Sequence, residues 1–524
     1  MSRGGTSEKE EKMVKMDRTK NASRNIIWGV IEKIAGLILP FFTRTVLIKT
    51  LGAEYLGLNS LFTSILQVLS ISELGFGTAI VFSMYRPVAE NDEDTLCALL
   101  NTYRKIYFYI GTIILTVGLA ITPFIKKLIS GTYPQDINIY ALFLIYLANT
   151  VIGYYLYAYK TALFSAYQRN DLASKRSAVV SCISNFLQII VLLFFHSYYA
   201  FVIIIPFATI LTNLANAYLA GKMFPGIVCR GSISKEQKNA LKKRIIGLLS
   251  FKIYGVVFDS VDVVVISAFL GLTQLAIYNN YYYVQKAVGG FLTILTTSIT
   301  AGIGNKMITN SKNDNYEDFK KFTFANGWIC SWCAVCMLCL YQHFMVWWVG
   351  EDLTFPFSTM CLIVAYFFIP RITHLTYTYR EAAGLWWEDR FRPLVSTVVN
   401  LVTNIILVQI MGMNGVIIST LICTIFINVP WGTIILFKKY FERSPMEYFS
   451  HIIFYFFITL GVGFFTLQIC NLFPEKGFLP LAGKCVVCLI IPNLLFFIIY
   501  HRCKEFEFVK YLGKRFLKHH GKRL

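Results

Sequence analysis

The sequence predicts an all-α polytopic membrane protein, and its composition, its apolar runs and an internal repeat support that class. Of the 524 residues, 56% are hydrophobic and 15% are charged, whereas soluble domains hold about 45–50% apolar and about 25% charged residues. The mean hydropathy is +0.56. Apolar runs long enough to cross a bilayer as a helix, about 18 residues or more, recur along the chain.

We predict about fourteen transmembrane helices, with boundaries good to about three residues. They lie near residues 25–48, 58–84, 106–129, 138–159, 177–196, 198–220, 245–270, 275–304, 322–345, 357–379, 393–410, 412–436, 450–472 and 482–500. The second of them carries Gly75 and Gly77, and a glycine pair favours a bend or close helix packing. Residues 1–24 are charged and polar, so we expect no cleavable signal peptide.

The first span is repeated roughly 219 positions later. Asn25–Leu51 is matched by Arg244–Leu270, and farther on Asn185 is matched by Asn404. The segment YAYKTA likewise recurs as YTYREA at the corresponding place. Because matching residues are separated by nearly the same number of positions all along the chain, we infer that one lobe has been duplicated.

The repeat predicts the domain organisation. We expect a cytoplasmic tail over 1–24, an N-lobe of six helices over 25–220, a cytoplasmic linker over 221–244, a C-lobe of six helices over 245–436, two further helices over 437–501 and a basic cytoplasmic tail over 502–524. Because six is even, both lobes enter the membrane in the same sense, and their pseudo-two-fold axis runs along the membrane normal.

The chain has a net charge of +20, and the placement of its Lys and Arg residues predicts the membrane topology. In a soluble protein such a charge would suggest a nucleic-acid partner, which we do not expect for this chain. With the N-terminus in the cytoplasm, roughly 39 of the 49 Lys and Arg residues lie on the inner side, as the positive-inside rule requires. We therefore predict that both termini are cytoplasmic.

Nine charged residues lie well inside predicted spans, away from the span ends, where a charge exposed to lipid costs about 3 kcal/mol on the mildest scale. Lys33 and Arg44 share one stripe of the first span with Leu37 and Pro40, and Lys252 occupies the place of Lys33 in the repeat. One interpretation is a set of buried ion pairs, such as Lys252 with Asp259, that hold helices together.

The other interpretation is a functional cavity between the lobes. Its cations would bind phosphate, which Arg and Lys suit; they are Lys33, Arg44, Lys252, Lys286 and Arg371. Its acids would couple transport to a cation, either H⁺ or Na⁺; they are Glu32, Glu73, Asp259 and Asp262. His374 lies one turn beyond Arg371, although a single His on a helix is more often merely hydrogen-bonded.

Two residue patterns have both a structural and a functional interpretation. The tyrosine runs at 154–159 and 278–283 favour an aromatic belt at the membrane interface over stacking on sugars. The cysteines at 330, 333, 336 and 339 favour small packing residues over a metal site, because this spacing drifts around a helix. We expect no disulfide and no bound metal.

No catalytic signature is present, so we expect no enzymatic activity and no cofactor. The sequence has no Gly-rich phosphate loop followed by Lys-Ser/Thr, no G-x-S-x-G and no H-E-x-x-H. Three function classes stay open: a flippase, a cation-coupled antiporter of small molecules, and a membrane polysaccharide polymerase or glycosyltransferase. The enzyme class is disfavoured because every predicted external connection is short.

The sequence resembles a known family, the bacterial lipid-linked oligosaccharide flippases of the polysaccharide (O-antigen and capsule, Wzx-type) export systems. These belong to the same superfamily (MOP) as the multidrug and toxin extrusion (MATE) antiporters. The resemblance covers residues 25 to about 500. It is carried by LGAEYLGLNSLFTSILQVLSISELGFGTAI, by YRPVAEND, and by GLWWEDRFRPLVSTVVNLVTNIILVQIMGMNGVIIST at Gly384–Thr420.

This resemblance implies fourteen helices around a central cavity that opens alternately to the two sides of the bacterial inner membrane. It implies an undecaprenyl-pyrophosphate-linked oligosaccharide as cargo, with the lipid bilayer and a coupling cation as the other partners. A polymerase or another polysaccharide-assembly protein is a further candidate partner. Cations near the first helix of each lobe are a family feature, and Lys33, Arg44 and Lys252 stand in comparable places.

Overall fold

The computed structural model describes residues 18–73, 75–474, 477–508 and 510. The side chains of residues 18–20, 22, 72, 243–244, 246–254, 259, 295, 297–298 and 301 lie outside the described part. Every regular element within the described ranges is helical. The chain divides into two compact units: unit 1 takes the described residues of Met1–Tyr55, Phe62–Lys126 and Pro134–Ile253, and unit 2 takes those of Leu56–Leu61, Lys127–Tyr133 and Tyr254–Leu524.

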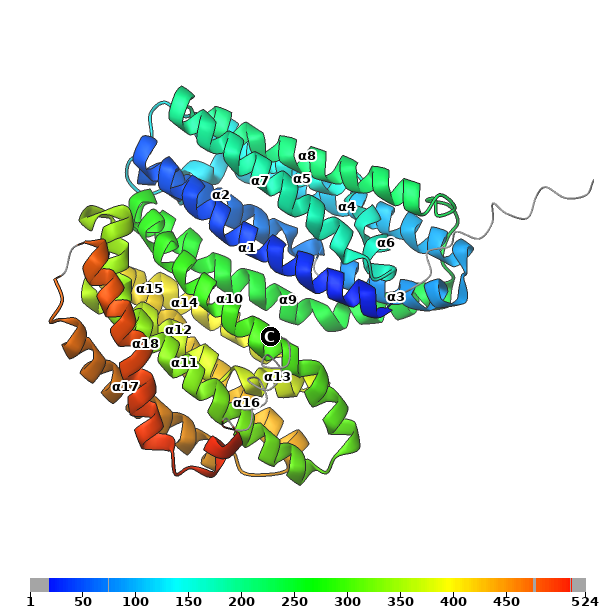
Figure 1. Cartoon of the computed structure of the whole chain (residues 1–524). Helices are drawn as coiled ribbons and strands as arrows, with labels where there is room; N and C mark the ends of the chain where they lie inside the picture. The colour runs from blue at the N-terminus through cyan, green and yellow to red at the C-terminus, as the bar shows by residue number, and fades with distance from the viewer. Residues whose placement is uncertain (1–17, 74, 475–476, 509, 511–524) are drawn as a thin grey trace, which may run out of the picture. The chain divides into compact units, whose positions relative to one another are not determined.

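The first half of the chain is a series of long helices joined by short turns. They are α1 (Arg18–Thr50), α2 (Ala53–Leu69), the 3₁₀ turn η1 (Ser70–Glu73), α3 (Phe76–Glu90), α4 (Glu93–Ile121), η2 (Thr122–Leu128), α5 (Ile139–Tyr155), η3 (Ala158–Lys160), α6 (Thr161–Ala166), α7 (Asn170–Phe195) and α8 (Tyr198–Met223). Figure 1 shows the long helices of this part running alongside one another, and α1 packs chiefly along α7.

The second half repeats this pattern and adds two helices. Its elements are α9 (Lys235–Leu270), α10 (Leu272–Thr309), α11 (Lys312–Val349), η4 (Glu351–Leu353), α12 (Phe357–Ile372), α13 (His374–Ala382), α14 (Arg392–Met411), α15 (Met413–Ile422), the π-helical η5 (Cys423–Asn428), α16 (Val429–Leu436), the π-helical η6 (Phe437–Phe441), α17 (Met446–Cys470) and α18 (Phe478–Tyr500). The two last helices pack against α11.

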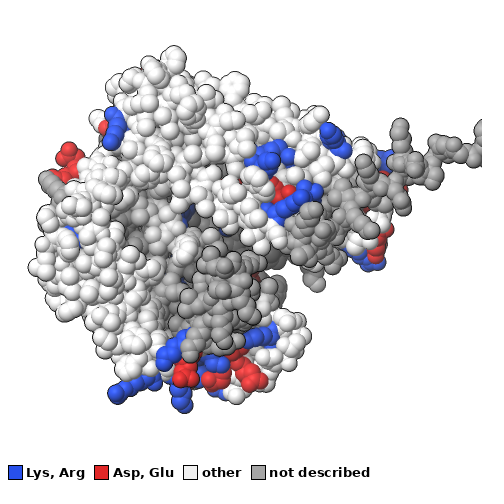
Figure 2. Space-filling model, viewed as in Figure 1, with Lys and Arg blue, Asp and Glu red and all other residues white. Residues whose placement is uncertain are grey.

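Ten described helices are long and apolar enough to cross a membrane, or eleven if the bent pair of α5 with the segment Ala158–Ala166 counts as one span. On the face shown in Figure 2, each unit presents a broad surface without Lys, Arg, Asp or Glu. The chain is therefore a multi-pass helical membrane protein, as the sequence predicts. Each of the fourteen predicted spans coincides with a helix or a run of helical segments, but the count of fourteen spans stays a prediction.

The second predicted span is interrupted where its glycines lie. The helix stops at Leu69, passes through η1 and restarts at Phe76. Gly75 has φ 102°, a left-handed conformation that only glycine adopts readily. The span is thus interrupted at the glycine pair, and Gly77 also packs closely, since an added Cβ would come within 2.7 Å of the Tyr103 hydroxyl; a bend there stays a prediction.

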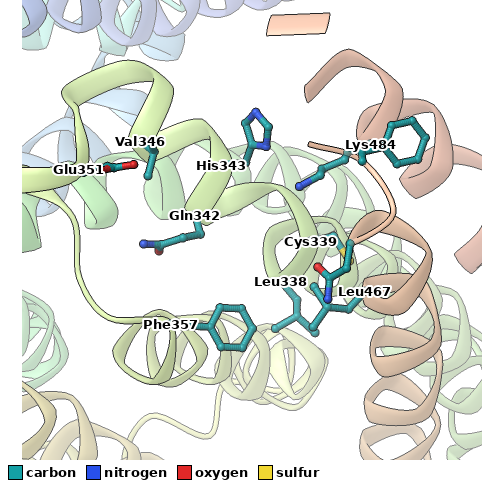
Figure 3. A pocket seen from close by; sticks show the side chains of 11 residues that line it. Leu338, Cys339, Gln342, His343, Val346, Glu351, Phe357, Leu467 and Lys484 are labelled. Atoms are coloured by element: carbon teal, nitrogen blue, oxygen red, sulfur yellow. The ribbon is translucent and has the colours of Figure 1, made fainter. Parts of the chain in front are cut away.

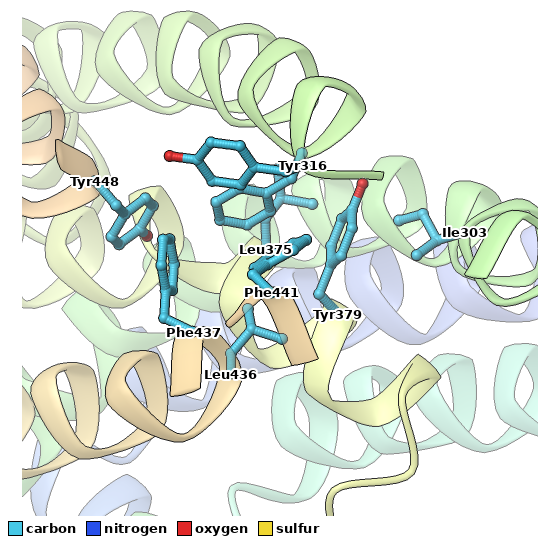
Figure 4. Close-up of a cluster of buried hydrophobic side chains, with 9 residues drawn as sticks. Ile303, Tyr316, Leu375, Tyr379, Leu436, Phe437, Phe441 and Tyr448 are labelled. Atoms are coloured by element: carbon cyan, nitrogen blue, oxygen red, sulfur yellow. The ribbon is translucent and has the colours of Figure 1, made fainter. Parts of the chain in front are cut away.

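One end of unit 2 is closed by an aromatic core. Tyr316 and Phe319 from α11 meet Tyr379 from α13, and Phe437 and Phe441 come from the π-helical turn after α16. Figure 4 shows the rings of Tyr316, Tyr379, Phe437 and Phe441 gathered in one cluster. Each of the five is at most 3% exposed, so this core holds α11, α13 and the turn after α16 together.

Candidate functional site

A buried carboxylate, that of Asp262, lies where four helices of unit 2 meet. It stands on α9 and is 2% exposed. Its Oδ1 accepts a hydrogen bond of 2.7 Å from Nδ2 of Asn404 on α14. Its Oδ2 accepts hydrogen bonds from the hydroxyls of Thr420 on α15, at 3.2 Å, and Tyr278 on α10, at 3.4 Å. These three hydrogen-bond donors are neutral side chains, and each of them solvates the carboxylate.

Further oxygen acceptors belong to the same cluster. Oδ1 of Asn404 is buried and has no hydrogen-bond partner among the described residues. The carbonyl of Val416 accepts from Thr420 at 3.3 Å, and Oδ1 of Asn400 accepts from Asn404 at 3.3 Å. A buried acceptor left without a partner costs about 1–3 kcal/mol. A bound cation relieves this cost, because hard cations prefer carboxylate and carbonyl oxygens.

The same place in unit 1 holds a neutral pair. Thr43 on α1 and Asn185 on α7 are separated from Asp262 and Asn404 by the 219-residue offset of the repeat. The hydroxyl of Thr43 donates a hydrogen bond of 2.8 Å to Oδ1 of Asn185. The polar contact between these two helices is therefore common to both halves. A carboxylate occurs only in the second half, and helix packing alone does not require it.

The predicted cations Lys286 and Arg371 are brought onto one face of α10. The guanidinium of Arg371, on α12, donates a hydrogen bond of 3.1 Å to the hydroxyl of Thr293. It also lies against Gly289, where an added Cβ would come within 2.7 Å of Nη2. Lys286 is exposed and precedes Thr293 by two turns on the same face. His374, one turn beyond Arg371, is half-buried.

The first-helix residues lie along α1 in unit 1. Lys33 is exposed, whereas Glu32 and Arg44 are half-buried. Lys33 and Arg44 share a stripe and are about 16 Å apart along the helix axis, at 1.5 Å per residue. The side chains of Lys252 and Asp259 lie outside the described residues, so their ion pair stays a prediction.

Glu73 is held by tyrosines beside the break between α2 and α3. Its two oxygens accept hydrogen bonds of 2.6 Å from the hydroxyls of Tyr107 on α4 and Tyr154 on α5. Tyr154 is 7% exposed. Its assignment to an interfacial aromatic belt is therefore wrong, because its hydroxyl serves an embedded carboxylate. Sequence reasoning missed the contact because the two residues are 81 positions apart.

A polar groove between α7 and α8 is the feature that sequence reasoning overlooked. It has a volume of about 400 Å³ and lies wholly in unit 1. Its polar lining consists of Ser177, Ser181, Ser184, Asn185, Gln188, Thr209, Thr212 and Asn213. The three- and four-residue spacing of the serines along an otherwise apolar span is the signal that could have revealed it.

Residues 22–300, more than half of the chain, match the family described as polysaccharide biosynthesis protein. The chain belongs to this family. No curated protein matches the sequence. The family assignment agrees with the resemblance found in the sequence.

Solved structures share the fold of this polysaccharide biosynthesis protein. A structure of the lipid II flippase MurJ in an inward closed conformation is similar with a TM-score of 0.67 and 15% identity, covering 91% of this chain and 99% of that one. An inward-facing multidrug resistance MATE family transporter of the MOP superfamily gives 0.57 and 13%, covering 78% and 97%. A mutant of the Vibrio cholerae MATE transporter VcmN gives 0.55 and 12%, covering 81% and 100%. The chain therefore shares its fold with these three proteins.

Proposed function

We propose that this protein is a flippase that moves undecaprenyl-pyrophosphate-linked oligosaccharide repeat units across the bacterial cytoplasmic membrane. The carried sugars would build a surface polysaccharide such as O-antigen or capsule. The family match over residues 22–300 is the observation that carries the proposal. The fold shared with MurJ supports it, since that protein is a lipid II flippase.

The pyrophosphate is the part of the cargo that the embedded cations would bind. Lys33 and Arg44 on α1, Lys252 on α9, Lys286 on α10 and Arg371 on α12 are the proposed counter-charges. Arg371 is the best positioned of those described in unit 2, because Thr293 and Gly289 hold its guanidinium against α10. Arg recognises phosphate through a planar fork, and Lys acts as a point charge.

The oligosaccharide needs hydrogen-bonding groups rather than charges. The groove between α7 and α8 offers hydroxyls and amides within an apolar span, and such groups match sugar hydroxyls. We propose that this groove contacts the sugar as the two lobes alternate between inward- and outward-open states. Both chain termini would stay in the cytoplasm.

The coupling cation would bind at Asp262, and we favour Na⁺. The carboxylate accepts from Nδ2 of Asn404 and from the hydroxyl of Thr420, which also bonds to the carbonyl of Val416, and hard cations prefer carboxylate and carbonyl oxygens. A proton would use only the carboxylate. Glu73 would position the bend between α2 and α3, since two tyrosines already occupy its oxygens. Glu32 and Asp259 are the remaining proposed coupling acids.

The proposal is tested by deleting the gene and analysing undecaprenyl-linked sugars by mass spectrometry. A flippase mutant should accumulate one complete lipid-linked repeat unit on the cytoplasmic side, and a plasmid copy should clear it. Normal surface polysaccharide with no accumulated intermediate would overturn the proposal. Accumulation of truncated sugars would overturn it as well, because it would indicate a defect in sugar assembly.

A further inference from the structure

Three cysteines from three helices of unit 2 meet in the interior. Cys339 comes from α11, Cys470 from the end of α17 and Cys488 from α18. Their sulfur atoms all lie within 4.8 Å of one another, and those of Cys470 and Cys488 are 3.9 Å apart. The three residues are 6%, 0% and 1% exposed. Only Cys339 belongs to the cysteine run on α11 that the sequence assigned to packing.

The spacing of these sulfurs matches a metal-centred thiolate site. With metal–sulfur bonds of about 2.3 Å, three thiolates around one Zn²⁺ stand about 3.8–4.0 Å apart, for tetrahedral or trigonal geometry. Structural zinc sites commonly use three or four cysteines. The cysteines already approach this arrangement from separate helices, so binding needs only small side-chain rotations.

A buried lysine beside the cluster is the second observation. Lys484 stands on α18 one turn before Cys488 and is 6% exposed. It lines a cavity of about 560 Å³ together with Cys339 and His343, and Figure 3 shows it extending from α18 toward the space beside those two residues. A buried ammonium is costly unless an anion offsets it. A divalent cation held by three thiolates carries a net charge of −1, which Lys484 offsets.

We propose that Cys339, Cys470 and Cys488 bind a thiophilic d¹⁰ cation of the Zn²⁺ class and so tie the two C-terminal helices to α11. On binding, three S–H bonds break, three metal–sulfur bonds form, and three protons leave to solvent through the cavity. The cavity, whose wall includes Cys339, is also the path by which the ion reaches the sulfurs. This site revises the expectation of no bound metal.

The test uses the purified full-length protein, reduced and reconstituted in lipid nanodiscs, with Zn²⁺ as the probe. Elemental analysis after gel filtration should find one more Zn²⁺ per chain in the wild type than in Cys339→Ser, Cys470→Ser or Cys488→Ser. Cys330→Ser is the matched control, because Cys330 lies on the same helix and is 0% exposed but is outside the cluster. It should keep the wild-type stoichiometry.

A second measurement needs no cysteine variant. Co²⁺ added to the reduced wild type should give sulfur-to-cobalt charge-transfer absorption, and Zn²⁺ should abolish it. Lys484→Gln should weaken Zn²⁺ binding about 10-fold or more, the usual loss for a group that supports the ligands of a metal. Folded wild type without charge-transfer absorption would overturn the proposal, and so would recovery of a Cys470–Cys488 disulfide from protein that contains no zinc.

Discussion

Asp262 and Thr43 occupy equivalent places in the two halves of the chain, yet only Asp262 can hold a charge. Both bond to the matching asparagine of a neighbouring helix. If the contact served only to hold helices together, the neutral pair would be the cheaper solution, because burying a carboxylate costs more than burying a hydroxyl. This difference between the halves is the reason to test Asp262 as a ligand of the proposed coupling cation.

We expect Na⁺ to stabilise the purified protein and Asp262→Asn to remove this effect. A ligand that binds only the folded state adds about 2.7 kcal/mol of stability at 100 times its Kd. Thermal unfolding in detergent, compared in sodium and choline chloride at equal ionic strength, measures the gain. Thr43→Val is the matched control and should keep the sodium response. An Asp262→Asn variant with the wild-type response would exclude this carboxylate as the site.

Arg44→Ala should stop assembly of the surface glycan while the protein still reaches the membrane. A charge-assisted hydrogen bond contributes about 1.5–3 kcal/mol, so we expect about a 10- to 100-fold loss of transport if the guanidinium binds pyrophosphate. Glycan immunoblots of a complemented deletion strain measure the effect. Lys49→Ala, at the exposed end of the same helix, should leave glycan levels unchanged. Normal glycan with Arg44→Ala would remove this residue from the mechanism.

At the residue scale, the sequence predicted which polar residues lie inside apolar spans. It predicted less well which residues contact them. The repeat offset paired Asn185 with Asn404, and hydropathy singled out Asp262 and Glu73 as embedded acids. Neither pattern revealed that Tyr154 serves Glu73 or that Cys339 meets Cys470, because these contacts join distant segments. Periodicity describes one helix at a time, whereas such contacts depend on how helices pack.

At the element scale, a buried ion pair links α13 to the loop before α14 and packs against a glycine of α16. Nη1 of Arg380 lies 3.2 Å from Oδ2 of Asp389, and Asp389 also receives two hydrogen bonds of 2.7 Å from Arg392. The Arg380 guanidinium packs against Gly432 of α16, where a Cβ would clash with it. The close approach of α13 and α16 thus requires a residue without a Cβ at position 432.

Gly432→Ala should destabilise unit 2 by about 1–3 kcal/mol, the usual cost of overpacking an interior. The added methyl displaces a guanidinium that is buried and paired, so the charge has no solvent to move into. Gly461→Ala on α17 is the matched control, since no atom lies within 4 Å of the place its methyl would take; alanine should be neutral or slightly stabilising there. Thermal unfolding in detergent distinguishes the two, and equal midpoints would contradict the packing argument.

The helices themselves were largely predictable, and their interruptions were less so. Long apolar runs located the elements, and Gly75 marked the break between α2 and α3. No comparable sequence signal predicts the π-helical turns at Cys423–Asn428 and Phe437–Phe441. They carry no glycine, and Pro430 lies after the first of them. The second turn contributes Phe437 and Phe441 to the aromatic core of unit 2, a contact that no local pattern reveals.

At the scale of the whole molecule, duplication and charge together predict how the chain is threaded through the bilayer. Two lobes of six spans place the linker and both termini on one side, and the excess of Lys and Arg lies on that same side. The segment between η2 and α5, which contains Thr132, must then face outward. The segment between α8 and α9, which contains Ser232, must face the cytoplasm.

Thr132→Cys should therefore react with a membrane-impermeant maleimide in intact cells, whereas Ser232→Cys should react only after the cells are permeabilised. Both positions are exposed in loops, so a difference between them reports sidedness and not burial. The unsubstituted protein, with its thirteen native cysteines, sets the background for each measurement. Labelling of Ser232→Cys from outside, with Thr132→Cys protected, would reverse the topology. It would also contradict the proposal that both chain termini lie in the cytoplasm.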